Sequence, residues 1–229
     1  KTAMKGKKTI FCGDIGCYTL GNAMPLDMVD TCLCMGAGLN IAQGVEKVEP
    51  DTTCFAFVGD STFFASAITG VVNAVYNQAN MVLIVLDNST TAMTGHQPHP
   101  GTGQTVMGEI VQKINIEQVL RGIGVTEIET INPLELEASV SCVKRMAEKT
   151  GVRAIIFKAP CIAVTKPKAP LHVDQDSCIS CKKCIRDLGC PAIVMNDGKI
   201  CIDASMCTGC RLCSQVCPVC AIAGGDDHE

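Results

Sequence analysis

Short apolar runs alternate with longer amphipathic stretches from Thr9 to Pro160. The short runs are rich in β-branched residues, as expected for strands buried in a parallel sheet, and the longer stretches have helical periodicity. We expect strands at Thr9–Cys12, Cys54–Val58, Met81–Leu86, Val125–Glu129 and Val152–Lys158, and helices near Gly38–Val48, Thr62–Asn77, Ile116–Gly122 and Pro133–Lys149. This order predicts an α/β fold with a doubly wound, mostly parallel sheet covered on both faces.

Two breaks interrupt this rhythm. The stretch Asn88–Gly108 is crowded with Thr, Gly, His and Pro and is too long for a simple connection, so we expect a functional loop. The stretch Thr165–Pro170 is expected to be a semi-rigid linker, because proline interrupts both helix and sheet. We therefore predict an α/β domain over residues 1–164, a linker over 165–170 and a small α+β domain over 171–229.

Composition and charge exclude two classes of protein. A net charge of −4, with Lys and Arg scattered along the chain, argues against a nucleic-acid partner. No apolar run reaches the roughly 18 residues that a membrane helix needs, and no signal-peptide core follows the basic start. We therefore expect a soluble, cytoplasmic protein without a membrane partner.

Seventeen cysteines in a chain without an export signal favour metal ligation over disulfides. Eight of them form the runs Cys178-x2-Cys181-x2-Cys184-x5-Cys190-Pro191 and Cys207-x2-Cys210-x2-Cys213-x3-Cys217-Pro218. Asp174 and Asp203 precede the two runs at the same distance, which predicts two related half-units. Two-residue gaps let three thiolates on one turn reach three irons of a cubic cluster, whereas the fourth ligand must come from elsewhere.

Both runs resemble those of bacterial two-cluster ferredoxins, in which the last cysteine of each run binds the other cluster. The resemblance implies one 4Fe-4S cluster on Cys178, Cys181, Cys184 and Cys217 and a second on Cys190, Cys207, Cys210 and Cys213. The gap before Cys190 is longer than usual, which leaves the local loop open. Structural zinc is the alternative, disfavoured by two triplets with Cys-Pro ends. Cys201 and Cys220 are interpreted as buried small apolar residues.

A second polar site is predicted at the ends of two neighbouring strands. Gly59-Asp60-Ser61 follows the second strand and Asp87-Asn88-Ser89-Thr90 follows the third, so both segments should meet at the carboxyl edge of the sheet. The helix that begins near Thr62 would offer free N–H groups to an anion there. Carboxylate, amide and carbonyl oxygens suit Mg2+ shared with phosphate. An ordinary strand end before a helix is the alternative.

These segments resemble the thiamine-diphosphate motif Gly-Asp-Gly followed by Asn-Asn, with Ser61 and Asp87 as replacements. The resemblance implies Mg2+ ligands at Asp60, Asn88 and the Thr90 carbonyl. The segments 12–21, 34–38 and 92–101 resemble the thiamine-binding part of 2-oxoacid:ferredoxin oxidoreductases, specifically the C-terminal portion of the large subunit of the indolepyruvate type, which also ends in two ferredoxin runs. The resemblance implies a cofactor-binding set of Asp14, Ile15, Gly16, Cys17, Gly36, Ala37, Gly59, Asp60, Ser61, Asn88, Thr90 and Thr94.

Two histidines lie in the long loop. His96 stands where pyruvate-type relatives have glycine, which makes it a candidate for substrate selection; an exposed loop position is equally open. For His99 the exposed position is the favoured interpretation. Met93 and Met107 are expected to fill gaps in the core.

The resemblance also implies an activity, namely oxidative decarboxylation of indolepyruvate or other aryl pyruvates to aryl-acetyl-CoA and CO2. Thiamine diphosphate, Mg2+ and two 4Fe-4S clusters would serve as cofactors, coenzyme A as co-substrate and an external ferredoxin as electron acceptor. Pyruvate, 2-oxoglutarate or branched 2-oxoacids are alternative substrates. An electron-carrier or scaffold protein without a thiamine site is the alternative of another class.

The family also predicts partners for this chain. Its thiamine enzymes place a glutamate that acts on the cofactor in a separate pyrimidine domain, and no such segment is found before the first strand, which starts soon after Lys1. We therefore expect a fragment or one component of a split enzyme. It would need that pyrimidine domain and a small partner subunit, and alone it should bind the cofactor weakly.

Overall fold

The computed structural model describes residues 1–224, which form two compact units. The first unit consists of Lys1–Asn22 and Met28–Cys161, and the second of Ala23–Asp27 and the chain from Ile162 onward. This division precedes the predicted linker at Thr165–Pro170 by a few residues. The roles expected for the two parts stay predictions.

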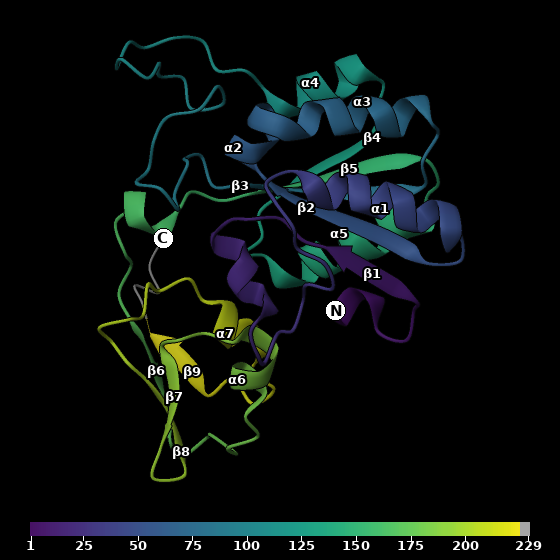
Figure 1. Cartoon of the computed structure of the whole chain (residues 1–229). Coiled ribbons are helices and arrows are strands. Elements are labelled where there is room, and N and C mark those ends of the chain that lie inside the picture. The colour runs from purple at the N-terminus through teal and green to yellow at the C-terminus, as the bar shows by residue number, and fades with distance from the viewer. Residues whose placement is uncertain (225–229) are drawn as a thin grey trace. The chain divides into compact units, whose positions relative to one another are not determined.

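A five-stranded parallel sheet forms the centre of the first unit, in the order β1-β2-β3-β5-β4 (Figure 1). Its strands are β1 (Thr9–Cys12), β2 (Thr53–Gly59), β3 (Met81–Asp87), β4 (Glu127–Ile131) and β5 (Val152–Lys158). β1 and β5 have the predicted bounds, and β2 and β3 extend the predicted strands by one or two residues. β4 begins two residues later than predicted.

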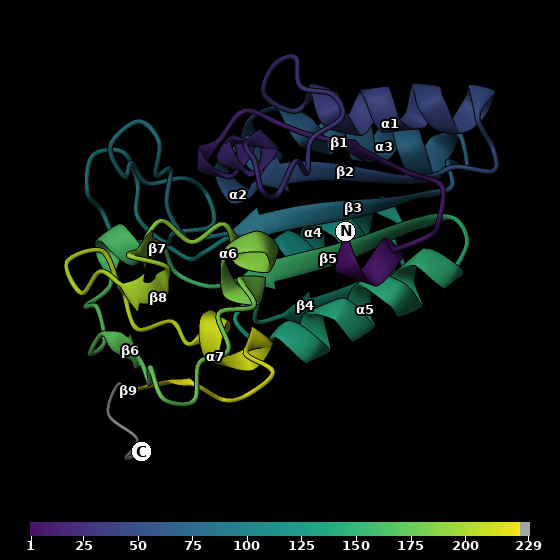
Figure 2. The same cartoon turned by 90° about the horizontal axis from the view of Figure 1, so that it is seen from below.

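Helices cover both faces of this sheet, so the predicted doubly wound α/β fold is confirmed (Figures 1 and 2). The helices are α1 (Ala37–Val48), α2 (Asp60–Thr62), a π-helical turn (Phe63–Ala67), α3 (Ile68–Tyr76), α4 (Ile116–Ile123) and α5 (Leu136–Glu148). The chain advances from β1 to β3, continues to β4 at the edge and then returns to β5. Because parallel crossovers are right-handed, this reversal places α5 on the face opposite α1, α3 and α4.

Successive residues of each strand supply the two cores. On β2, Cys54 and Val58 pack toward α1 and α3, whereas Phe55 packs toward α5, where it meets the buried Met146. All four side chains are fully buried. The near-continuous apolar runs in the sequence reflect this burial on both faces.

The late start of β4 has a local cause at the end of α4. Gly124 has a left-handed φ of 109°, and its N–H donates to the carbonyl of Arg121. The N–H of Val125 donates to the carbonyl of Leu120 over 3.0 Å, which completes a Schellman motif. Val125 is therefore buried as the apolar residue of a helix cap, and the strand begins only at Glu127.

The second unit consists of two β-α-β halves. The first half is β6 (Leu171–Val173), α6 (Lys183–Leu188) and β7 (Ile193–Asn196); the second is β8 (Lys199–Ile202), α7 (Leu212–Val216) and β9 (Ile222–Gly224). β6 pairs with β9 and β7 with β8, both antiparallel, so each half is paired with the other. These small antiparallel sheets agree with the predicted ferredoxin-like domain.

The predicted repeat is present in the backbone of the second unit. Asp174 N–H donates to Ala221 over 2.8 Å, and Asp203 N–H donates to Ala192 over the same distance. Each aspartate carbonyl accepts the N–H of the first cysteine of its run at 3.0 Å. The two cysteine turns thus have the same hydrogen bonds at equivalent positions.

The two remaining cysteines of this unit differ from the prediction. Cys220 is exposed and Cys201 is only half-buried, so their interpretation as buried apolar residues was wrong. Cys220 has a left-handed φ of 52° in the turn after Pro218, which leaves its side chain outside the small core. None of the helices within residues 1–224 combines the length and the hydropathy of a membrane-spanning segment.

Candidate cofactor site

A pocket of about 130 Å³ opens in the first unit where β2 and β3 end. We call it the edge pocket. Nine of the residues predicted to bind a cofactor line it: Ile15, Gly16, Cys17, Gly59, Asp60, Ser61, Asn88, Thr90 and Thr94. Parallel strands bring these segments together, although they lie far apart in the sequence.

Asp60 joins the ends of the two strands. Its side chain is almost fully buried, and Oδ2 accepts the N–H of Ser89 over 2.8 Å. Oδ1 accepts the N–H of Ser61 over 2.8 Å. Ser89 adopts a left-handed φ of 62°, and its N–H is also held by Asp87 Oδ1 at 3.0 Å. The carboxylate of Asp60 therefore has a fixed orientation at the floor of the pocket.

The turn after β3 is linked to the same floor. Asn88 Oδ1 accepts the N–H of Thr90 over 3.1 Å, a turn that asparagine stabilises by itself. Thr91 donates a 2.9 Å hydrogen bond from its hydroxyl to that of Ser61. Asp60, Asn88 and the backbone of Thr90 are thus brought together in the predicted way.

Three predicted residues do not line the edge pocket: Asp14, Gly36 and Ala37. Asp14 is buried behind the wall, where its carboxylate accepts the N–H of Gly36 over 2.7 Å and the hydroxyl of Tyr18 over 2.6 Å. The Tyr18 hydroxyl in turn accepts the N–H of Gly59 over 2.7 Å. In this structure Asp14 therefore supports the wall of the pocket from behind.

Tyr18 was not among the predicted site residues, yet it shapes the pocket. Burial, and then the neighbouring Asp14 carboxylate, raise the pKa of Tyr18, so the phenol keeps its proton and donates to Asp14. The position of Tyr18 also accounts for glycine at two places in the pocket lining, because a Cβ there would lie very close to the tyrosine side chain. A Cβ at Gly16 would lie 2.4 Å from the Tyr18 ring, and one at Gly59 would lie 3.1 Å from its hydroxyl.

Of the loop histidines and methionines, His99, Met93 and Met107 lie in unexpected places. His96 is exposed and does not line the edge pocket, whereas His99 is buried at 8% exposure. The expectation of an exposed His99 was wrong, because the ring is held against Asp60. Met93 and Met107 are exposed, so their expected core role was also wrong.

The oxygen atoms at the pocket floor fit a magnesium ion. Asp60 Oδ1 and Asn88 Oδ1 each accept one internal hydrogen bond, which leaves each a free lone pair. Among residues 1–224, no three His, Cys, Asp or Glu side chains are placed to hold one metal ion. A magnesium ion here would instead use one carboxylate, one amide oxygen and the Thr90 carbonyl, with phosphate oxygens completing its preferred oxygen shell.

In the second unit, cysteines from both runs line one small pocket. They are Cys178, Cys181 and Cys184 of the first run and Cys217 of the second, the set predicted for one cluster. Apolar side chains, among them Ile200 and Ile222, complete its lining. Two backbone N–H groups point at cysteine sulfurs, Ala221 at Cys217 over 3.3 Å and Leu171 at Cys207 over 3.5 Å.

The second predicted set contains one buried member, Cys213. Burial, followed by the neighbouring thiols of Cys210, Cys190 and Cys207, raises the pKa of the Cys213 thiol to about 11. The long gap before Cys190 is accommodated by α6, which continues to Leu188 and ends at Gly189 with a left-handed φ of 57°. Iron would stabilise these thiolates, since metal binding releases the thiol proton.

A family model identifies the class of protein to which this fold and its edge pocket belong. Residues 14–157 match the family model for the C-terminal, thiamine pyrophosphate-binding domain of thiamine pyrophosphate enzymes. The chain therefore belongs to the thiamine pyrophosphate enzyme family.

Curated relatives are similar to most of this chain. The chain is 42% identical to indolepyruvate oxidoreductase subunit IorA of Methanothermobacter thermautotrophicus, over 96% of this chain and 36% of the relative. It is 40% identical to the subunit of the same name from Archaeoglobus fulgidus, over 90% of this chain and 34% of the relative. The chain thus spans about a third of the length of the curated relatives it matches.

A solved structure shares the fold. The 2-oxoglutarate:ferredoxin oxidoreductase of Magnetococcus marinus, solved with 2-oxoglutarate, coenzyme A and succinyl-CoA bound, superposes with a TM-score of 0.61. The match covers 71% of this chain and 57% of that chain at 18% identity.

Proposed function

We propose that this chain carries the thiamine diphosphate and Mg2+ site and two 4Fe-4S clusters of a cytoplasmic 2-oxoacid:ferredoxin oxidoreductase. The observation that supports this most strongly is the presence, in one chain, of the edge pocket with Asp60, Asn88 and Thr90 in its lining and of a second pocket lined by four cysteines from both runs. An electron carrier without a thiamine site would not need the fixed carboxylate of Asp60.

The chain's own residues have distinct tasks in this proposal. Asp60, Asn88 and the Thr90 carbonyl would hold Mg2+, and Tyr18 keeps the wall next to Gly59 in place. When bound, thiamine diphosphate supplies the nucleophilic carbon for decarboxylation of a 2-oxoacid, and the clusters accept the released electrons one at a time. The eight cysteines would bind those clusters, and an external ferredoxin would take up the electrons from them.

Indolepyruvate or another aryl pyruvate is the proposed substrate, with coenzyme A as acyl acceptor and aryl-acetyl-CoA and CO2 as products. The names of the curated relatives support this choice. Substrate selection by His96 is part of the proposal and requires the exposed ring to meet the substrate once the missing parts of the enzyme are present.

The matched relatives are far longer than this chain, so the complete enzyme would include more than the two units. We propose the pyrimidine domain and a small partner subunit as the further components. Size-exclusion chromatography of the co-expressed components should give a complex that has activity. Full turnover by this chain alone would contradict the need for partners.

The decisive experiment is anaerobic viologen reduction by the complete enzyme with a panel of 2-oxoacids. Indolepyruvate and phenylpyruvate should give the highest kcat/KM, and the reaction should require coenzyme A, Mg2+ and thiamine diphosphate. A preference for pyruvate or 2-oxoglutarate would contradict the proposed substrate but not the proposed type of reaction. No 2-oxoacid-dependent reduction at all would contradict the proposed function.

A further inference from the structure

His99 makes a direct contact with the proposed magnesium ligand. Its Nε2 lies 3.1 Å from Oδ2 of Asp60, and the two side chains are only 5% and 4% exposed. The two residues are 39 positions apart and come from different segments, the long loop and the start of α2. The contact is therefore a product of the tertiary fold.

The other ring nitrogen identifies the tautomer. The N–H of Gly101 donates to Nδ1 of His99 over 3.1 Å, so Nδ1 must be the unprotonated nitrogen. The proton of the neutral ring then lies on Nε2 and is donated to Asp60. Both ring nitrogens are engaged in this way, which leaves neither free to bind a metal ion.

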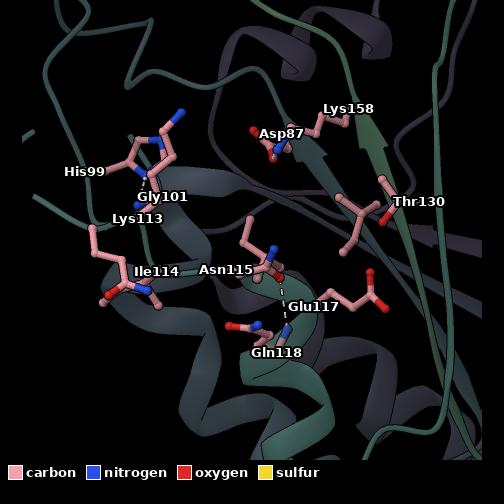
Figure 3. A pocket seen from close by; sticks show the side chains of 13 residues that line it. Asp87, His99, Gly101, Lys113, Ile114, Asn115, Glu117, Gln118, Thr130 and Lys158 are labelled. Carbon is pink, nitrogen blue, oxygen red and sulfur yellow. Dashed lines mark hydrogen bonds and ion pairs between the residues drawn. The ribbon is translucent and has the colours of Figure 1, made fainter. Parts of the chain in front are cut away.

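The ring is held firmly in this position. It lies beside Phe64, with ring centroids 5.8 Å apart, and the Thr102 hydroxyl donates to the His99 carbonyl over 2.8 Å. A Cβ at Gly101 would approach both rings to 3.0 Å, so a residue larger than glycine does not fit at this position. Figure 3 shows His99 and Gly101 together in the wall of a neighbouring pocket, whose lining includes Asp87 and Lys158.

The two carboxylate oxygens of Asp60 accept different numbers of hydrogen bonds. Oδ2 accepts from both Ser89 and His99 and has no lone pair left, whereas Oδ1 accepts only from Ser61. We propose that His99 is a positioning residue that occupies Oδ2 of Asp60 and thereby presents Oδ1 as the single oxygen available to Mg2+. The inference rests on the proposed function, because it assumes that Asp60 is a magnesium ligand.

Substitutions of His99 that move or remove the hydrogen-bond donor test this inference. A glutamine amide nitrogen can take the place of Nε2, whereas an asparagine amide nitrogen reaches only about as far as Nδ1, and leucine has no donor. In the full-length enzyme, His99→Asn and His99→Leu should weaken the Mg2+ affinity about 10- to 100-fold, as loss of a supporting contact to a metal ligand does. His99→Gln should remain within about 3-fold of the wild type, because it retains the donor that the argument requires.

The measurement is a calorimetric titration of cofactor-free enzyme with Mg2+ at fixed thiamine diphosphate. Met107→Leu is the matched control from the same loop and should leave the Mg2+ affinity unchanged, because Met107 is 88% exposed and does not line the edge pocket. Thermal unfolding without Mg2+ reports any loss of packing separately, and a purely structural role would not rank Gln above Asn and Leu in Mg2+ affinity.

Two results would overturn the inference while the proposed function stands: wild-type Mg2+ affinity in His99→Leu, or equal affinities for the Gln and Asn variants. Absence of Mg2+-dependent thiamine diphosphate binding by the wild-type enzyme would overturn the proposed function, and this inference with it.

Discussion

The hydroxyl of Tyr18 lies 2.6 Å from Oδ2 of Asp14 and donates a hydrogen bond to this buried carboxylate. The same hydroxyl accepts the N–H of Gly59, the residue before Asp60. One phenol therefore connects the loop after β1 with the turn that begins the edge pocket. This connection makes the pocket wall dependent on Tyr18, which itself lines the edge pocket.

Tyr18→Phe should destabilise the protein measurably. The substitution leaves a buried carboxylate oxygen and the Gly59 N–H short of a partner, which costs about 1–3 kcal/mol of unfolding free energy. Tyr76→Phe is the matched control, because Tyr76 is 83% exposed, and it should change the unfolding free energy by less than about 0.5 kcal/mol. Urea unfolding of both variants provides the comparison. Equal stabilities would contradict a bracing role for Tyr18.

Two glycines of α1 should respond in opposite directions to alanine. A Cβ at Gly38 would lie 2.3 Å from the Gly13 carbonyl oxygen, so Gly38→Ala must push α1 away from the end of β1 and destabilise the protein. Gly44 faces open space in the same helix, and Gly44→Ala should stabilise by about 0.5–1 kcal/mol through helix propensity. Thermal unfolding distinguishes the two. A stabilised Gly38→Ala would show that the close approach is absent in solution.

The crossed ligation of the clusters can be tested by counting iron. Two cubic clusters hold about eight irons, so Cys217→Ser should leave about four. If Cys217 shares a cluster with Cys181, the double variant with Cys181→Ser also keeps about four, whereas the double variant with Cys210→Ser keeps almost none. Cys220→Ser is the control and should retain about eight, because that exposed thiol lies outside both sets. The reverse pattern in the double variants would indicate local ligation.

The buried thiol of Cys142 should make stability depend on alkaline pH. Burial, and then its hydrogen bond with Glu129, raise the pKa of this thiol from 9.0 to about 12. The unfolded state loses the proton first, so the stabilisation is complete below pH 9 and is lost as the pH rises toward 12. Above pH 9, the unfolding free energy of the wild type should fall relative to Cys142→Ala by up to about 1.4 kcal/mol per pH unit. A difference that stays constant from pH 7 to 10.5 would contradict the raised pKa.

The sequence predicted most of the sheet because the strands are specified locally. β1 and β5 have the expected bounds, since their apolar runs end at turn residues. β4 was displaced because Val125 serves a helix cap, and an apolar residue in a cap cannot be distinguished by pattern from the first residue of a strand.

Within the candidate site, the sequence predicted the positions of only those residues that directly follow a strand. Asp60 and Asn88 could be assigned because neighbouring parallel strands fix their common edge. The partnership of His99 with Asp60 depends on the path of a long irregular loop, which no periodicity specifies. Pro98 and Pro100, which restrict the backbone on both sides of His99, were the available signal that this part of the loop is rigid.

The most direct test of the account follows electrons from the edge pocket to the cysteines. Anaerobic full-length enzyme with Mg2+, thiamine diphosphate and coenzyme A is mixed with indolepyruvate, and the reduced clusters are recorded by electron paramagnetic resonance. The wild type should show substrate-dependent cluster reduction, and Asp60→Ala should lose it while keeping its iron and its reduction by dithionite. Cluster reduction that proceeds equally well in Asp60→Ala, or without thiamine diphosphate, would contradict the account.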